Sequence, residues 1–238
     1  MSQGKVTIAQ GGDKGMDLTQ ALDGYCERLG PAFWAEPWNA LSNLAFLVAA
    51  LVMARRLRGQ ALPLAQVLTG LLAIIGLGSF LFHTTAQVWS ALADTLPIVL
   101  FALVYLFAAN RAYLGLRRLP ALGLALLYLP LTAVLTPLLS ALPFFRISAM
   151  YWPLVGAFLS YALVLRARLP QVARGLVIAG GLLTASLTFR SLDMPLCGAV
   201  PMGTHFLWHV VNAVLLGWVI EVYRRHHLRS LAAPASDR

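Results

Sequence analysis

The stretch IIGLGSFLFHTTA, residues 74–86, places His83 near the end of a long apolar run. A second stretch, THFLWHVVNAVLLGW at residues 204–218, carries His205 and His209 in similarly apolar surroundings. An ionisable side chain at membrane depth is costly, so it faces a bundle interior or a wet cavity and usually has a function. The sequence therefore predicts a membrane protein whose interior holds functional histidines.

The composition is that of a multi-pass membrane protein. Of the 238 residues, 59% are hydrophobic and only 11% are charged, which is far more apolar than an ordinary soluble domain. A bilayer span needs about 20 mostly apolar residues. We expect one all-α domain, a seven-transmembrane-helix bundle, with spans at residues 39–57, 63–84, 91–110, 119–140, 147–166, 174–190 and 203–223.

Polar segments flank the expected bundle. Residues 1–22 form an N-terminal tail, residues 23–225 the transmembrane domain, and residues 226–238 a cytoplasmic tail. The first 30 residues lack an apolar core, so we expect no cleaved signal peptide. The compact, Arg- and Ala-rich composition favours a bacterial inner (cell) membrane. No sequence pattern indicates an oligomeric state.

The basic residues indicate an orientation. The formal net charge is +9, but most of the Lys and Arg residues lie in alternate connections, so no nucleic-acid partner is expected. The positive-inside rule puts these connections in the cytoplasm, with the N-terminus extracytoplasmic and the C-terminus cytoplasmic. The clusters are Arg55, Arg56 and Arg58; Arg111, Arg117 and Arg118; Arg166, Arg168 and Arg174; and Arg224, Arg225, Arg229 and Arg238.

This orientation brings polar residues together in the outer third of the bundle. His83 ends the second span, Asp94 begins the third, and His205 with His209 begins the seventh. Residues four apart share one helix face, so His205 and His209 can bind one metal, with His83 as third ligand. Three neutral imidazoles and an open fourth position form a catalytic zinc site. The alternative is a set of separate, hydrogen-bonded core histidines.

Two further polar residues suit catalysis. Ser79 lies one turn before His83 on the same helix face, where its hydroxyl could donate to a developing oxyanion or bond to its own i−4 carbonyl. Asp94 could act as a general base or orient a metal ligand. It could also be a helix N-cap or a carboxylate stabilised by the helix dipole.

The segment before the first span is rich in acidic oxygens and contains a cysteine. Asp23, Glu27 and Glu36 are of the kind that suits calcium, and a solvated acidic surface is the alternative. Cys26 and Cys197 both fall in expected extracytoplasmic segments, where disulfides persist. A bridge would tie the N-terminal segment to the loop before the histidine pair, and two free buried thiols are the alternative.

The combination S-x3-H, a following Asp, and H-x3-H resembles the alkaline ceramidase family, seven-span membrane hydrolases related to the adiponectin receptors. The resemblance runs in order from Asp23 to Tyr223. It implies hydrolysis of the ceramide amide to a sphingoid base and a fatty acid. The segments that carry it are YCERLGPAFWAEPWNALSNLAFL (25–47), GSFLFHTTAQVWSALADTLPI (78–98) and PMGTHFLWHVVNAVLLGWVIEVY (201–223).

The resemblance also implies roles for single residues. By motif, His83, His205 and His209 match its zinc ligands, and Ser79 and Asp94 match its catalytic serine and aspartate. Cys26 and Cys197 match its disulfide pair.

Calcium-responsive members imply a second metal site. Glu27 and Glu36 match two carboxylate ligands, and Tyr25 matches a residue that offers its backbone carbonyl. The pattern then departs: Asp23 comes one residue too early, and Leu29 stands where an Asn ligand is expected.

We therefore interpret the chain as a zinc-dependent intramembrane amidase, with Zn²⁺ and a candidate Ca²⁺ as cofactors and a ceramide-like bilayer lipid as substrate. The second interpretation is a receptor-like or lipid-binding protein with a structural metal site. Structural sites usually close with four protein ligands, and no fourth His or Cys is found at this depth, which favours the enzyme. Arg190 and Asp193 are expected to form a local pair in an outer loop.

Overall fold

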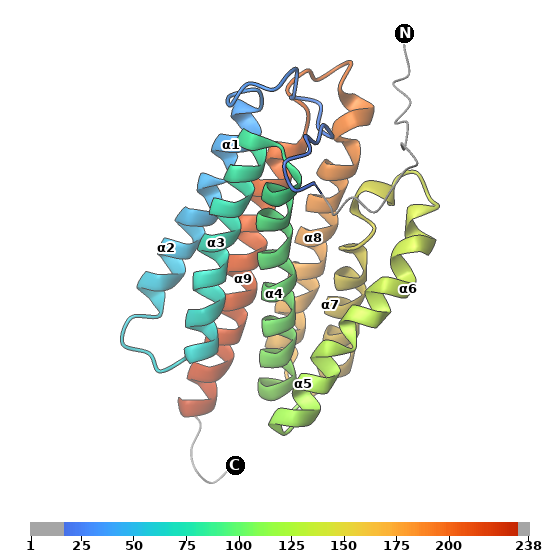
Figure 1. Cartoon of the computed structure of the whole chain (residues 1–238). Coiled ribbons are helices and arrows are strands. Elements are labelled where there is room, and N and C mark those ends of the chain that lie inside the picture. Colours follow the sequence, from blue (N-terminus) through green and yellow to red (C-terminus); the bar gives the residue numbers. More distant parts are fainter. Residues whose placement is uncertain (1–16, 233–238) are drawn as a thin grey trace.

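The chain folds into a bundle of helices. The computed structural model describes residues 17–232, and the regular elements within that range are helices, as the sequence predicts. Figure 1 shows the long helices running side by side along the bundle. The elements are α1 (Pro37–Ser42), α2 (Leu44–Arg56), α3 (Pro63–Thr85), α4 (Val88–Ala112), α5 (Arg118–Leu126), α6 (Tyr128–Ser140), the 3-10 helix η1 (Arg146–Ser148), α7 (Trp152–Leu165), α8 (Pro170–Leu196) and α9 (His205–Ala232).

Six helical stretches are long and apolar enough to cross a membrane. Two of them are helix pairs broken at a single residue, α1 with α2 at Asn43 and α5 with α6 at Leu127. A seventh span at 147–166 is not confirmed, because α7 has only 14 residues. At 1.5 Å per residue it extends about 21 Å, which is short of the ~30 Å hydrocarbon thickness.

Local sequence explains where several helices begin and end. Pro37, Pro63 and Pro170 stand in the first turns of their helices, where the missing N–H costs nothing and the fixed φ is already helical. Arg55 and Arg56 occupy the last turn of α2, where positive charge complements the helix dipole.

Close helix contacts form at small residues. A Cβ added at Gly78 in α3 would lie 2.1 Å from the carbonyl oxygen of Ala93 in α4. A Cβ added at Gly175 in α8 would lie 2.7 Å from a methyl group of Val222 in α9. Membrane helices approach one another at such positions. By contrast, α6 has no buried residues and leans away from the other helices in Figure 1.

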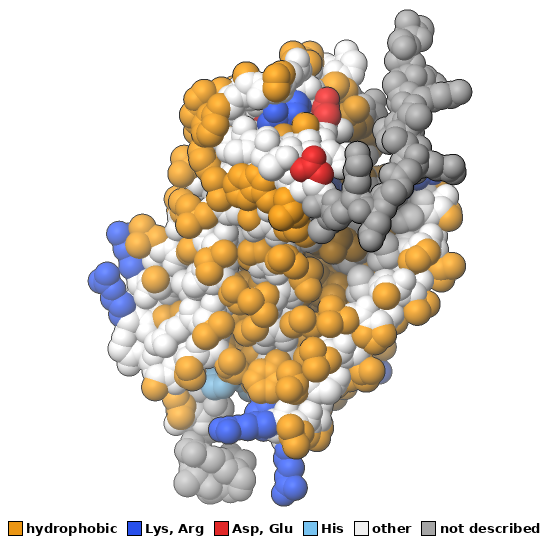
Figure 2. Space-filling view, viewed as in Figure 1, with side chains coloured by type: hydrophobic (Ala, Val, Ile, Leu, Met, Phe, Trp, Pro, Cys, Tyr) orange, Lys and Arg blue, Asp and Glu red, His pale blue; other side chains and the backbone are white. Residues whose placement is uncertain are grey.

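The surface divides into zones along the bundle. In Figure 2, hydrophobic side chains cover the middle of the visible face, and Lys and Arg side chains gather toward the lower end. The acidic side chains in this view lie near the upper end, where α3 meets α4 and α9 begins. An apolar band between two polar ends suits a multi-pass membrane protein. Which end faces the cytoplasm stays a prediction.

Candidate metal centre

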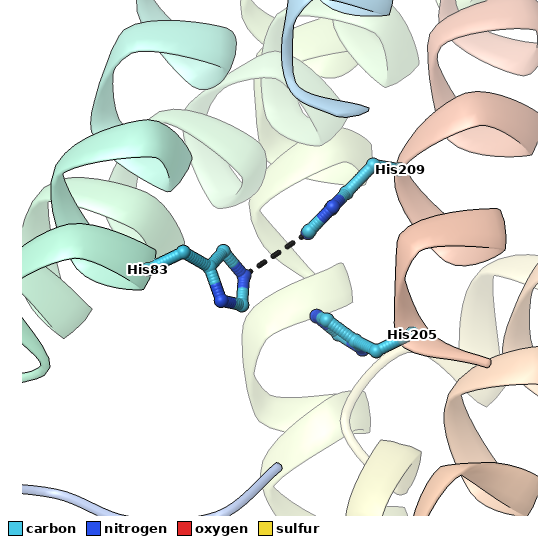
Figure 3. A group of neighbouring side chains, drawn as sticks. All are labelled: His83, His205 and His209. Carbon is cyan, nitrogen blue, oxygen red and sulfur yellow. Dashed lines mark hydrogen bonds between the residues drawn. The ribbon is translucent and has the colours of Figure 1, made fainter. Parts of the chain in front are cut away.

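The three histidines meet at the upper end of the bundle. His83 comes from the last turn of α3, and His205 and His209 from the first two turns of α9. Their ring centroids lie 4.6 to 5.1 Å apart, and each residue is only 1% exposed. Figure 3 shows the rings converging from two helices. One ligand nitrogen from each residue lies within 4.8 Å of the others, so a single metal ion can reach all three.

Hydrogen bonding determines which nitrogen of His83 faces this centre. Its Nδ1 lies 2.6 Å from the carboxylate Oε2 of Glu36. Burial raises the pKa of Glu36, but hydrogen bonds from His83 and its other partners outweigh burial and leave that pKa below its ordinary value. An ionised carboxylate only accepts, so Nδ1 of His83 donates. In the neutral ring, Nε2 of His83 is therefore an unprotonated acceptor.

A hydroxyl contacts the outer ring nitrogen of His209. The Oγ of Ser42 lies 2.9 Å from the carbonyl oxygen of Asn39 and 2.7 Å from Nδ1 of His209. A hydroxyl has one proton, and when Ser42 donates it to Asn39 it accepts from Nδ1, which leaves Nε2 of His209 free to bind a metal ion.

The inner nitrogens of His83 and His209 face each other. The Nε2 atoms of His83 and His209 lie 3.1 Å apart, at the contact drawn in Figure 3. Two lone pairs at this distance repel unless a positive charge lies between them. Nitrogens bound to one tetrahedral zinc at ~2.0–2.1 Å are about 3.3–3.4 Å apart. The Nδ1 of His205 is buried without a hydrogen-bond partner in residues 17–232. These residues fit a zinc ion.

Ser79 and Asp94 lie beside the histidines. The Oγ of Ser79 is 3.4 Å from Nε2 of His209. Asp94, from the second turn of α4, lines two cavities. One of them is mostly apolar and is also lined by Ser79 and His209. A hydroxyl, a carboxylate and an imidazole therefore share one cavity.

This apolar cavity extends far into the bundle. It follows α4 from Asp94 to Ala109, which is about 22 Å at 1.5 Å per residue. One leaflet of the hydrocarbon core is about 15 Å deep, half of the ~30 Å total. The lining is therefore as long as a lipid hydrocarbon chain, but the open volume is only about 60 Å³, so the lining side chains must move apart to admit one. Its other lining residues include Phe46, Phe101, Phe158, Leu183 and Leu216.

A family model described as Ceramidase matches residues 25–231. The chain belongs to the ceramidase family. None of the curated proteins matches the chain. The matched range contains the three histidines, Ser79 and Asp94, and family membership implies hydrolysis of the ceramide amide bond.

Glu27, expected as a calcium ligand from the ceramidase pattern, caps a helix instead. Its Oε1 accepts the backbone N–H of Trp38 at 2.6 Å, and its Oε2 accepts that of Asn39 at 2.8 Å. These are two of the N–H groups that the start of α1 leaves free. Burial raises the pKa of Glu27, and these two hydrogen bonds limit the rise.

Glu36 is bound to a cation that the chain itself supplies. The buried guanidinium of Arg28 donates from Nε to Oε1 of Glu36. It also donates to the carbonyl oxygens of Gly30 and His83, each at 2.9 Å. Asp23, a further expected ligand, is exposed. These residues do not fit a calcium ion.

Tyr25 covers the metal centre with its side chain. Its ring centroid lies 4.0 Å from that of His205 and 5.1 Å from that of His83. Its backbone carbonyl, expected as a calcium ligand, accepts the N–H of Arg28 at 3.2 Å. Burial raises the pKa of Tyr25, so the phenol is neutral near pH 7. The calcium site predicted from Asp23, Tyr25, Glu27 and Glu36 is therefore not supported.

A disulfide and a buried carboxylate hold the N-terminal segment over the start of α9. Cys26 and Cys197 are bonded, with their Cα atoms 5.4 Å apart. Asp193 accepts the backbone N–H groups of Thr204 at 2.7 Å and His205 at 2.9 Å through Oδ1. Its Oδ2 accepts the N–H of Cys26 at 2.9 Å. Asp193 therefore anchors the first histidine of α9.

Sequence reasoning missed several residues that organise this centre. Asp193 forms no pair with Arg190 among the described residues, contrary to expectation. It caps a helix that begins 12 positions later, too far for a local capping signal. Ser42 and Arg28 make their contacts across the fold, so no periodicity could have indicated them.

Proposed function

We propose that this ceramidase-family protein is a zinc-dependent intramembrane amidase. Its substrate is ceramide or a related N-acyl lipid, and its products are a fatty acid and a sphingoid-type amine. The observation that carries the proposal is the convergence of three buried imidazoles, with ligand nitrogens within 4.8 Å of one another, beside an apolar cavity that Ser79, Asp94 and His209 also line.

The chain's own residues supply the other catalytic groups. Zinc held by His83, His205 and His209 would act as a Lewis acid and lower the pKa of its water. Asp94 accepts the proton of the attacking water and passes it to the leaving amine. Ser79 donates a hydrogen bond to the oxygen of the tetrahedral centre.

The arrangement also suits a substrate that stays in the bilayer. The acyl chain would enter the apolar cavity along α4 as its lining side chains move apart, with the amide near Asp94. We propose seven crossings, with α7 and the turns before it as the shortest, and the metal centre near the extracytoplasmic surface. The Arg- and Ala-rich composition favours a bacterial inner membrane.

The runner-up is a receptor-like or lipid-binding protein with a structural metal site. A structural zinc usually has four protein ligands. Among residues 17–232, the metal-binding group contains three histidines and no fourth His, Cys, Asp or Glu. An open ligand position beside a carboxylate and a hydroxyl favours the enzyme.

The test is hydrolysis of a panel of N-acyl lipids by purified protein in detergent. We expect ceramide or another panel member to be hydrolysed, the activity to be lost with a zinc chelator, and zinc to restore it. His209→Ala should lose zinc and activity, whereas the matched control His227→Ala, at the far end of α9, should keep both. No hydrolysis of any panel member by zinc-loaded protein would favour the binding-protein interpretation.

A further inference from the structure

A second cavity adjoins the metal centre and differs from the apolar one in character. It has a volume of about 150 Å³ and is lined by Tyr25, Thr95, Tyr151 and Arg190 among others. This is room for roughly five water molecules, or for a small polar group. Four residues line both cavities and so mark their junction: Asp94, Ile98, Tyr151 and Trp208.

Arg190 brings a positive charge to this cavity and forms no salt bridge within residues 17–232, although the carboxylate of Asp94 lines the same cavity. One Nη donates to the carbonyl oxygen of Ile147 and lies 3.3 Å from Oγ of Ser148. The other Nη lies 3.4 Å from the hydroxyl of Tyr25. A guanidinium has five N–H donors and no acceptor, so donors remain for a ligand.

Two aromatic rings orient the guanidinium. The Cζ of Arg190 lies 5.6 Å from the ring centroid of Tyr151 and 5.5 Å from that of Trp208. Cation–π contacts offset part of the cost of burying the charge, but an anion offsets more because it both neutralises the charge and accepts hydrogen bonds. The remaining donors therefore suit an anionic oxygen group.

Arg190 and Asp94 are the two charged side chains that line this cavity. Amide hydrolysis converts R–CO–NH–R′ and water into R–COO⁻ and H₃N⁺–R′, so the leaving half gains a positive charge. An amine half that carries an anion close to its nitrogen would match both side chains, with the ammonium toward Asp94 and the anion at Arg190.

We propose that the polar cavity holds the amine half of the substrate and that Arg190 selects an N-acyl lipid with a carboxylate or phosphate near the amide nitrogen. This proposal rests on the amidase function and refines its substrate class. A charge-assisted hydrogen bond contributes about 1.5–3 kcal/mol, which corresponds to roughly 10- to 150-fold in kcat/KM.

The experiment compares two matched substrate pairs with identical acyl chains. N-palmitoylserine and N-palmitoylserinol differ in a carboxylate against a hydroxymethyl group, and N-palmitoyl ceramide 1-phosphate and N-palmitoyl ceramide differ in a phosphate. We expect the wild type to prefer the charged member of at least one pair, which also identifies the anion. Arg190→Gln should lower kcat/KM for that member by 10- to 150-fold and change the neutral member less than threefold.

Controls separate selectivity from a structural role. Arg146→Gln removes an exposed arginine from the neighbouring 3-10 helix and should leave the charged-to-neutral ratio unchanged. If Arg190→Gln lowers both members of a pair equally, Arg190 is structural and the proposal is wrong. If that variant does not fold, the wild-type ratios decide alone, and values at or below one in both pairs overturn the proposal. Ceramide hydrolysis without charge preference would overturn it while leaving the amidase function intact.

Discussion

The carboxylate of Glu36 lies 2.6 Å from Nδ1 of His83, on the side of the imidazole opposite to the nitrogen that faces the other histidines. A carboxylate in this position fixes the tautomer of a ligand and raises its basicity. Glu36 forms an ion pair with Arg28. This ion pair, which lies before α1, therefore orients the ring of His83 in α3.

Glu36→Gln should therefore weaken zinc binding by about 10- to 100-fold, the usual effect of removing such a partner. Zinc affinity can be measured by competition with a chromophoric chelator. Glu27→Gln is the matched control, because Glu27 caps α1 and contacts none of the three histidines through a hydrogen bond. Its zinc affinity should stay at the wild-type value. Equal losses in both variants would show that the effect is structural.

Calcium should have no effect on activity. The guanidinium of Arg28 donates to the carboxylate of Glu36, which calcium would need as a ligand. Both carboxylate oxygens of Glu27 accept backbone N–H groups. Hydrolysis measured with zinc buffered, and with calcium either added or removed by a selective chelator, should be the same within twofold. Calcium-dependent activation would show that Arg28 can leave Glu36.

The proposed catalytic roles can be separated from metal binding at Asp94 and Ser79. Asp94→Asn should keep its zinc and lose general-base function, on the order of 10²–10⁴-fold in kcat. Ser79→Ala should also keep its zinc and lose about 10²–10³-fold. Zinc content measured by elemental analysis beside turnover checks both. Full activity in Asp94→Asn would exclude the assigned mechanism.

Gly78 should be the glycine of α3 that least tolerates a side chain. A Cβ there would lie 2.1 Å from the carbonyl oxygen of Ala93, the residue before Asp94. Gly78→Ala should push α3 and α4 apart, lower the thermal unfolding midpoint in detergent, and destabilise the protein by about 1–3 kcal/mol. Gly70→Ala is the control, because its Cβ meets nothing within 4 Å. Similar midpoints for the two variants would contradict the close contact.

The orientation can be tested with single cysteines at exposed positions of the two ends. The native cysteines are joined in a disulfide, so background labelling should be low. Ala32→Cys, before α1, should react with an impermeant thiol reagent in intact cells. Arg58→Cys, after α2, should react only after lysis, because the positive-inside rule puts that end in the cytoplasm. The reverse pattern would move the metal centre to the cytoplasmic face.

The histidine trio could be predicted because its signals are local or depend only on topology. His205 and His209 share a face by helix geometry, and alternating spans bring His83 to the same end. The path of residues 26–36 has no such regularity, so the sequence pattern indicates a calcium ligand at Glu36, whereas its carboxylate contacts His83 and Arg28. The apolar run at residues 147–166 predicts a full span, but α7 begins only at Trp152 and has 14 residues. Hydropathy alone does not indicate where a helix begins within such a run.

The disulfide that joins Cys26 to Cys197 spans a sequence separation of 171 residues. Cys197 directly follows α8, and the histidine pair begins α9, so the bridge needs the chain through α8 and the group of three histidines needs the first two turns of α9. A chain cut short before Cys197 therefore lacks both the bridge and the complete group of three histidines.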